Sequence, residues 1–184
     1  MSKCVFICPI GFVEEDIIER ITGCIESRCG IICNVSTGME NPKYAYDERR
    51  SQYNSKLILQ HLIKCCPHEA LRFMGITYVD LFVPVLKFVF GLAQMEGQCS
   101  IISTHRLRPQ FYDQPPDPSL FLARVEKTAL HELGHCLGLT HCRDRRCVMY
   151  SSTRIEDTDS KQSDFCPTCI ELFQWHLDRY IKST

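Results

Sequence analysis

The chain has 184 residues, of which 45% are hydrophobic and 23% are charged, as in an ordinary globular protein. A chain of this length can bury a core that is stable as one domain without disulfides or oligomerisation. The formal net charge of −1 gives no reason to expect binding to nucleic acid or an anionic membrane, and no apolar run is long enough to span a bilayer. We therefore expect a monomer that binds neither nucleic acid nor a membrane.

The first apolar run of the chain has two interpretations. Residues 4–10 follow Lys3 and resemble a weak signal peptide, but acidic residues at 14–16 follow at once and no small-residue cleavage site is present. A buried first strand explains this pattern better, so we expect a cytoplasmic protein. In a reducing compartment, metal binding is the first explanation to test for the 13 cysteines.

The first three-quarters of the chain mix predicted strands and helices, which indicates an α+β fold. Apolar residues at helical spacing indicate helices, and short apolar runs bounded by turn residues indicate strands. On this basis we predict strands at 4–10, 31–35, 72–83, 87–93 and 99–104, and helices at 13–28 and 51–65. The stretch 39–50 is predicted to be a loop, and Glu96-Gly97 a turn between antiparallel strands.

The next predicted helix has clear start and stop signals. Asp117 is suited to cap its N-terminus, with Pro118 in the first turn. Gly138 is suited to end it, because glycine tolerates the positive φ that lets the chain turn back. An irregular, cysteine-rich segment at 142–166 then leads to a final predicted helix at 167–182.

The helix that begins at Pro118 carries the motif HELGH at 131–135. His131 and His135 lie about 40° apart on such a helix, one turn above the other, so both imidazoles can bind one zinc ion. Glu132 lies about 60° from His135, so its carboxylate can reach a water on that metal. His141 completes a three-histidine site with a fourth position open to water, as in catalytic zinc sites. HExxH alone also occurs on ordinary helices, but the added glycine and third histidine favour catalysis.

Four later cysteines have the spacing of a second metal site. Cys142 with Cys147, and Cys166 with Cys169, form two pairs separated by a loop, as in closed tetrahedral zinc sites. The other nine cysteines lack this spacing, and we interpret them as small packed side chains. Metal binding or oxidation remains an alternative for the three cysteines between residues 24 and 33.

The extended motif at 131–141 resembles that of the metzincin metallopeptidases, in which Met149 would belong to a tight turn beneath the metal. Together with the four cysteines, it resembles the archaemetzincin family over residues 131–169. Residues 88–93 and 103–107 are also similar to the sheet region of that family. The spacer between Met149 and the final CxxC is slightly shorter here, a difference that a loop can absorb.

The resemblance implies a twisted mixed β-sheet with packed helices, an active-site helix and a small zinc-stabilised C-terminal subdomain. Residues 1–184 would form one catalytic domain, with an upper subdomain at 1–138 and a lower subdomain at 139–184 that holds the Cys₄ site. An edge strand at 99–105 would border the active-site cleft. A peptide substrate could bind to that edge in extended conformation, using backbone hydrogen bonds.

These observations predict a zinc metallopeptidase with two zinc ions per chain. His131, His135 and His141 would bind the catalytic zinc, and Glu132 would act as general base on the activated water. The four cysteines would bind a structural zinc that stabilises the last part of the chain, which has few apolar residues. Tyr150 has only weak support as a hydrogen-bond donor in catalysis. The alternative, a non-catalytic zinc-binding interaction module, leaves Glu132 and the open coordination position unexplained.

Overall fold

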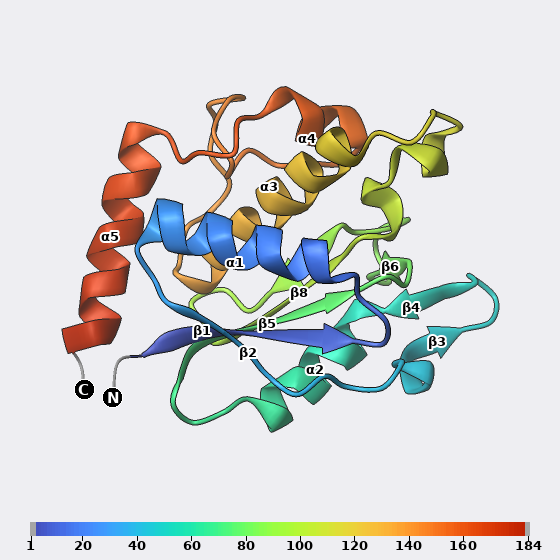
Figure 1. Cartoon of the computed structure of the whole chain (residues 1–184), viewed down its shortest axis with the longest axis horizontal. Coiled ribbons are helices and arrows are strands. Elements are labelled where there is room, and N and C mark those ends of the chain that lie inside the picture. The colour runs from blue at the N-terminus through green and yellow to red at the C-terminus, as the bar shows by residue number, and fades with distance from the viewer. Residues whose placement is uncertain (1–2, 183–184) are drawn as a thin grey trace.

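The first strand of the chain lies inside the central sheet, with one neighbouring strand on each side. In the computed structural model, which describes residues 3–182, five strands form this sheet in the order β2-β1-β5-β8-β7 (Figure 1). The strands are parallel except for β7, which is antiparallel to β8. They are β1 (Cys4–Ile10), β2 (Cys33–Val35), β5 (Ala70–Thr77), β7 (Gly91–Ala93) and β8 (Cys99–Ser103). Parallel strands need crossover connections, and helices supply two of them.

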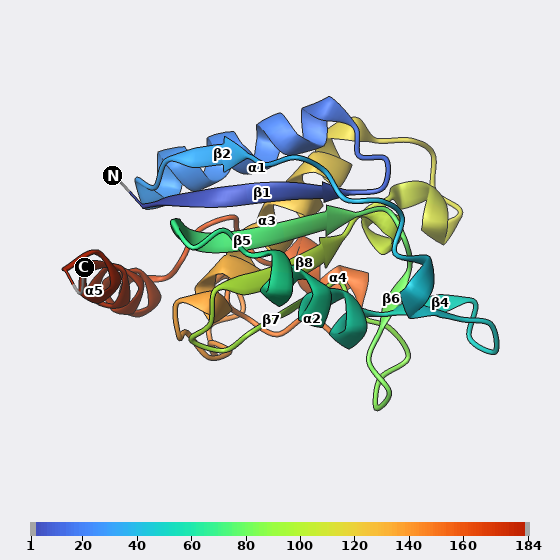
Figure 2. The ribbon, with the colours of Figure 1, turned by 90° about the horizontal axis from the view of Figure 1, so that it is seen from below.

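Helices cover both faces of the central sheet. α1 (Glu15–Cys29) and α3 (Pro118–Cys136) lie on one face, and α2 (Ser55–Cys65) lies on the other (Figures 1 and 2). Strand β5 contributes apolar side chains to both faces: Met74 and Ile76 join the cluster with α1 and α3, whereas Phe73 joins the cluster with α2. Such burial on both faces explains the almost continuous apolar sequence of this strand.

Two of the three strands in a second sheet come from segments that the sequence pattern misassigned. Its strands lie in the order β3-β4-β6 and are β3 (Tyr46–Asp47), β4 (Gln52–Asn54) and β6 (Leu81–Phe82). The predicted loop at 39–50 therefore contains a strand, together with the 3₁₀ helix η1 (Lys43–Ala45). The helix predicted at 51–65 begins only at Ser55, because the Asn54 side chain caps it by accepting a hydrogen bond from the Lys56 amide at 3.1 Å.

The strand that forms the edge of the central sheet also differs from the predicted one. Strand β8 lies between β5 and β7, so the segment 99–105 has no free edge, and β7 is the edge strand instead. Only Gly91–Ala93 of the predicted strand 87–93 pairs with β8. The strand predicted at 72–83 is interrupted after Thr77, where the chain leaves the central sheet for the second one.

The last part of the chain packs on the main core instead of building a separate one. It contains α4 (Ile155–Ser160), within the segment predicted to be irregular, and α5 (Pro167–Lys182), which agrees with the final predicted helix. Val148, Phe173 and Leu177 belong to the same apolar cluster as α1 and α3. The 3₁₀ helices η2 (His105–Leu107) and η3 (Pro109–Tyr112) connect β8 to α3. Within residues 3–182 no helix has both the length and the apolarity needed to cross a membrane.

Candidate metal centres

Helix α3 places two of the predicted metal ligands one turn apart. It begins as predicted, with the Asp117 carboxylate accepting a hydrogen bond from the Leu120 amide at 3.0 Å and Pro118 in the first turn. The Nε2 atoms of His131 and His135 lie 3.1 Å apart. Two nitrogens on one tetrahedral zinc ion, each at 2.0–2.1 Å, are about 3.3 Å apart, so the spacing fits a shared metal.

His141 reaches the same point after the chain reverses at Gly138. This glycine has a φ of +90°, and the Leu139 amide donates to the carbonyl of Gly134 at 2.9 Å. The ring centroid of His141 lies 5.3 Å from that of His131 and 5.0 Å from that of His135. One nitrogen from each of the three rings lies within 4.8 Å of the other two. The sequence prediction that these residues come together is confirmed.

The outer nitrogens of the two helical histidines are fixed by backbone carbonyls. His131 Nδ1 lies 2.8 Å from the carbonyl oxygen of Val148, and His135 Nδ1 lies 2.7 Å from that of Leu139. A ring that donates from Nδ1 presents the lone pair of Nε2 to the centre of the site. Burial lowers the pKa of both imidazoles and of His141, which favours the neutral form that a metal needs.

Met149 lies against the helix between the two histidines. It is fully buried, and a Cβ atom added at Gly134 would approach its Sδ atom to 2.4 Å. The glycine in the HELGH motif therefore leaves space for the methionine, which agrees with the predicted packing beneath the site. Tyr150 is absent from the described residues that line the cleft beside the histidines, so its suggested role in catalysis gains no support.

The four cysteines meet in a second cluster. Their Sγ atoms all lie within 4.8 Å of one another, and those of Cys142 and Cys166 are 3.8 Å apart. Thiolates at 2.3 Å from a tetrahedral zinc ion would be about 3.8 Å apart, so this donor set also fits a metal. The Cys166 amide donates to Cys147 Sγ at 3.3 Å, a contact that stabilises charge on sulfur. Cys136, in contrast, is buried in the core and donates to the Cys99 carbonyl, as expected for a packed thiol.

A cleft of about 730 Å³ opens beside the histidines. The segment 86–93 supplies one part of its wall, α3 supplies His131, Glu132 and His135, and residues 151–153 supply another part. Glu132 is only 6% exposed, and burial raises the pKa of its carboxyl group to about 8. A carboxyl group that titrates near neutrality is suited to both accepting and returning a proton.

Comparison with known proteins identifies the family of this chain. Residues 16–175 match the model of peptidase family M54. The chain belongs to peptidase family M54. It is similar to the archaemetzincin of Methanocaldococcus jannaschii, with 39% identity over 166 residues and 90% of each chain covered. It is also similar to that of Methanopyrus kandleri, with 42% identity over 178 residues that cover 94% of this chain and 98% of the relative.

The fold of this M54 peptidase agrees with that of a solved relative. The crystal structure of the archaemetzincin from Methanopyrus kandleri superposes with a TM-score of 0.82 at 35% identity, covering 96% of this chain and 97% of the other. The resemblance to the archaemetzincins is thereby confirmed. The chain is a zinc metallopeptidase acting on peptides or proteins, and the non-catalytic module considered from the sequence is not favoured. Its possible metal sites are the three-histidine and four-cysteine clusters.

Lys161 is a residue of the M54 cleft that sequence analysis missed. It is 4% exposed, and its Nζ donates to the carbonyls of Val148 at 3.0 Å and Tyr150 at 2.7 Å. Burial lowers its pKa to about 8, although the neighbouring Glu132 acts in the opposite direction. Lys161 follows a polar stretch, Asp157 to Ser160, that is typical of a protein surface, so no local signal distinguishes it.

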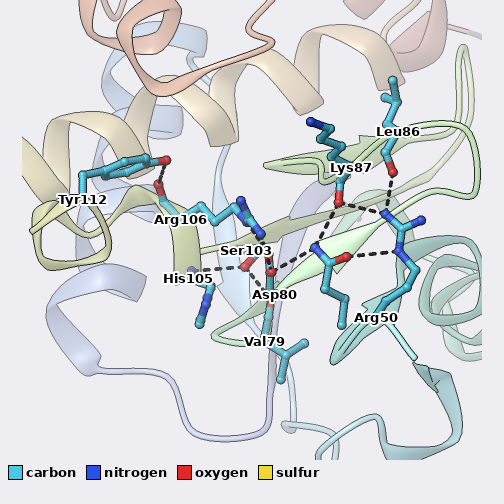
Figure 3. Close-up of polar contacts among 10 residues, drawn as sticks. Arg50, Val79, Asp80, Leu86, Lys87, Ser103, His105, Arg106 and Tyr112 are labelled. Carbon is cyan, nitrogen blue, oxygen red and sulfur yellow. Dashed lines mark hydrogen bonds and ion pairs between the residues drawn. The ribbon is translucent and has the colours of Figure 1, made fainter. Parts of the chain in front are cut away.

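A polar network holds the cleft-lining segment of this M54 peptidase in place (Figure 3). The Arg50 guanidinium donates to the carbonyls of Leu86 and Lys87 at 2.8 and 2.9 Å, and Gln52 donates to the second of these at 3.0 Å. Gln52 also donates to Asp80, which accepts two hydrogen bonds from Arg106 at 2.7 and 2.8 Å. The second sheet thus supports one wall of the cleft, a long-range role that no local motif indicates.

Gly91 of β7 lies so close to Glu132 that a substitution at residue 91 can test whether catalysis depends on the position of this carboxyl group. A Cβ atom at residue 91 would lie 2.7 Å from both Cγ and Oε1 of Glu132. We expect Gly91→Ala to displace the carboxylate and to lower kcat/KM by up to about 10²-fold, because small errors in the position of a reacting group have large effects. Steady-state kinetics beside a thermal melt would measure this.

Gly23→Ala in α1 is the matched control for this change. Apart from the neighbouring backbone of α1 itself, no atom lies within 4 Å of a Cβ added there, so activity should be unchanged, with a small gain in helix stability. If both alanine variants cleave peptides as fast as the wild type, the close approach of β7 to Glu132 has no importance for catalysis.

Proposed function

We propose that His131, His135 and His141 hold a catalytic zinc ion and that Glu132 is the general base for peptide-bond hydrolysis. The observation that carries this proposal is the convergence of three imidazoles in the wall of a cleft that also contains the buried Glu132. The carbonyls of Val148 and Leu139 orient the first two rings from behind. His141 lies on the solvent side, which leaves the site accessible to a substrate.

A zinc ion bound there would supply Lewis acidity, polarising the scissile carbonyl and lowering the pKa of a water molecule to about 7. Glu132 accepts the proton from the attacking water as the tetrahedral intermediate forms. It then returns this proton to the amine as the carbon–nitrogen bond breaks. The raised pKa of Glu132 suits both transfers, since neither its acid nor its base form is strongly disfavoured near pH 7.

The substrate is proposed to bind in extended conformation along β7. This strand ends the central sheet, and its residues 91–93 line the cleft directly beside Glu132. A peptide that adds to this edge gains backbone hydrogen bonds and brings its cleaved bond towards the histidines. Leu86, Phe88 and Leu92 in the same wall offer apolar contacts for the side chains of the substrate.

The four cysteines are proposed to hold a second, structural zinc ion. A closed set of four thiolates leaves no position for a substrate and adds folding free energy instead. We propose that residues 139–184 behave as a lower subdomain held by this metal, although they share the apolar core of residues 1–138. Cys142 directly follows His141, so the second metal would also hold the third histidine in position.

Metal content and peptide cleavage test this proposal together. We expect protein purified in reducing, chelator-free buffer to contain two zinc ions per chain. One would be bound by the three histidines and the other by the four cysteines. The open site should release its zinc to a chelator first, and cleavage of a fluorogenic peptide library should stop and then return when zinc is added. A reproducible zinc content near zero, or cleavage that persists without metal, would refute the assignment.

A further inference from the structure

The most exposed large apolar residue among those described lies at the rim of the cleft. It belongs to a hairpin, called here the rim hairpin (residues 81–89), whose ends pair as an antiparallel bridge. At the tip, Pro84 occupies the position that proline favours in a turn, which the Leu86 amide closes by donating to the Val83 carbonyl at 2.9 Å. Val85 is 87% exposed and Leu86 is 53% exposed, and Figure 2 shows the hairpin projecting below β6.

The backbone of the rim hairpin is held by side chains of the second sheet. Arg50, in the turn between β3 and β4, donates to the carbonyls of Leu86 and Lys87 at 2.8 and 2.9 Å. It also donates to Gln52 at 3.1 Å, and Gln52 donates to the Lys87 carbonyl at 3.0 Å. In Figure 3 the carbonyls of Leu86 and Lys87 point towards Arg50, whereas their side chains point away from it. Backbone oxygens therefore make the anchoring contacts, and both side chains are left available for a ligand.

Phe88, at the base of the rim hairpin, has an anchor of its own. The guanidinium carbon of Arg106 lies 4.3 Å from the centre of the Phe88 ring, which packs edge-on against Phe90 with 5.2 Å between centroids. Arg106 is fixed by two hydrogen bonds to Asp80, the carboxylate that also accepts from Gln52. Loop tips are usually mobile, whereas this one is held by a connected network. An exposed apolar surface that is already ordered loses little conformational entropy when a ligand binds.

The position of the rim hairpin indicates which ligand covers it. Residues 86–88 line the cleft that contains the histidines, and the chain continues from them into β7. Gly91 lies beside Glu132, so a peptide extended along β7 has its cleaved bond close to this glycine. Residues 88 and 86 precede Gly91 by three and five positions, so the hairpin reaches substrate residues up to about five positions from that bond. Because the hairpin precedes β7, it contacts the substrate on one side of the bond.

We propose that the rim hairpin is a second, remote binding element for the substrate, and that Arg50 is the positioning residue that holds it. The hairpin selects an apolar side chain two to five residues (~7–17 Å) from the cleaved bond, on one side only. This inference rests on the proposed peptidase function and adds a substrate class to it. An apolar side chain is the group that exposed apolar surface in a binding cleft buries. The direction of the peptide along β7 determines whether that residue precedes or follows the cleaved bond.

Matched peptides test this selection. Leucine is compared with asparagine, which has a similar shape, at each position from two to five on either side of the cleaved bond. For the wild type we expect kcat/KM to be at least about fivefold higher for leucine at one or two positions on one side, as partial burial of a leucine side chain provides. The difference should appear in KM, because a contact remote from the reacting atoms is equal in the ground and transition states.

Two substitutions assign the preference to its residues. Leu86→Asn changes an exposed side chain and should reduce the preference to about twofold or less, by raising KM for the leucine peptide. Arg50→Lys keeps the charge but replaces the planar fork with a single amine that cannot bind both carbonyls and Gln52, and it should reduce the preference by about threefold, again through KM. Leu57→Asn on the exposed side of α2 and Arg49→Lys, both away from the cleft, should leave activity and preference unchanged.

The outcomes separate this inference from the proposed function. Wild-type cleavage without discrimination between leucine and asparagine at any of these positions would overturn the rim hairpin and leave the peptidase intact. A preference that survives Leu86→Asn would also overturn it, as would a variant that changes only the sedimentation of the protein, because the hairpin would then serve self-association. Equal loss on both members of a pair in Arg50→Lys would overturn the positioning role. If the wild type cleaves none of the peptides, the same pairs are tested for binding to zinc-loaded protein by fluorescence anisotropy, where equal affinities would overturn the inference.

Discussion

Replacing Glu132 with glutamine is expected to lower peptide hydrolysis by about 10²-fold or more while both zinc ions remain bound. Glutamine has nearly the same shape and fits beside Gly91, but it cannot accept the proton of the attacking water. The Glu132 side chain is not among the three that converge in the histidine cluster, so metal affinity should change little. Steady-state kinetics and elemental analysis of the same preparation would show both effects.

Glu19→Gln is a suitable control, because Glu19 lies on the exposed side of α1, away from the cleft. This variant should match the wild type in activity and zinc content. A Glu132→Gln protein that cleaves the best substrate at the wild-type rate would show that another group is the base. A variant that is inactive because it has lost zinc would instead place Glu132 among the groups that hold the metal.

Cys169→Ser is expected to affect both metal sites. Removal of one thiolate should release the structural zinc, and with it the constraint on the chain between Leu139 and Val148. The carbonyls of these two residues accept hydrogen bonds from His131 and His135, the histidines of α3 that we propose as metal ligands. We therefore expect a loss of catalytic zinc affinity or activity of about 10- to 100-fold, as is usual when the groups behind metal ligands are disturbed.

Hydrogen exchange would show where the Cys169→Ser protein loosens. Protection should fall most between residues 139 and 166, and less in α5, because Phe173 and Leu177 remain buried in the main core. The central sheet should keep its protection. Cys65→Ser is the matched control, since Cys65 is an exposed free thiol on α2. Unchanged protection and activity in the Cys169→Ser protein would show that the four cysteines are ordinary core residues.

The candidate site could be predicted from the sequence where its geometry is local. The positions of His131, Glu132 and His135 follow from the helical repeat, and the positive φ of Gly138 explains the approach of His141. The cysteine pairs have a similarly diagnostic spacing. In each case a few neighbouring residues determine the arrangement, so a linear pattern is sufficient to find it.

The rest of the site depends on pairings between distant segments. The segment 99–105 is predicted at the sheet edge, but the internal position of β8 follows from the antiparallel return of β7, which no short pattern specifies. Lys161 looks like a surface residue because its burial is produced by Val148, Tyr150 and α3, which are remote from it in sequence. The interruption of the strand predicted at 72–83 likewise follows from pairing of Leu81–Phe82 with β4.

The order of strands in the central sheet has a consequence for how the molecule folds. β1 pairs with β5, which brings Val5 beside Arg72, a residue far from it in the sequence. β5 in turn pairs with β8, which comes later in the chain. Parallel pairings between remote segments are slow to form, because the entropy of closing a long loop is lost before any stabilising contact forms. α3 and β7, which enclose Glu132, can be placed only on a sheet that already contains β8. Assembly of the sheet should therefore set the folding rate, and zinc should be captured after that barrier has been crossed.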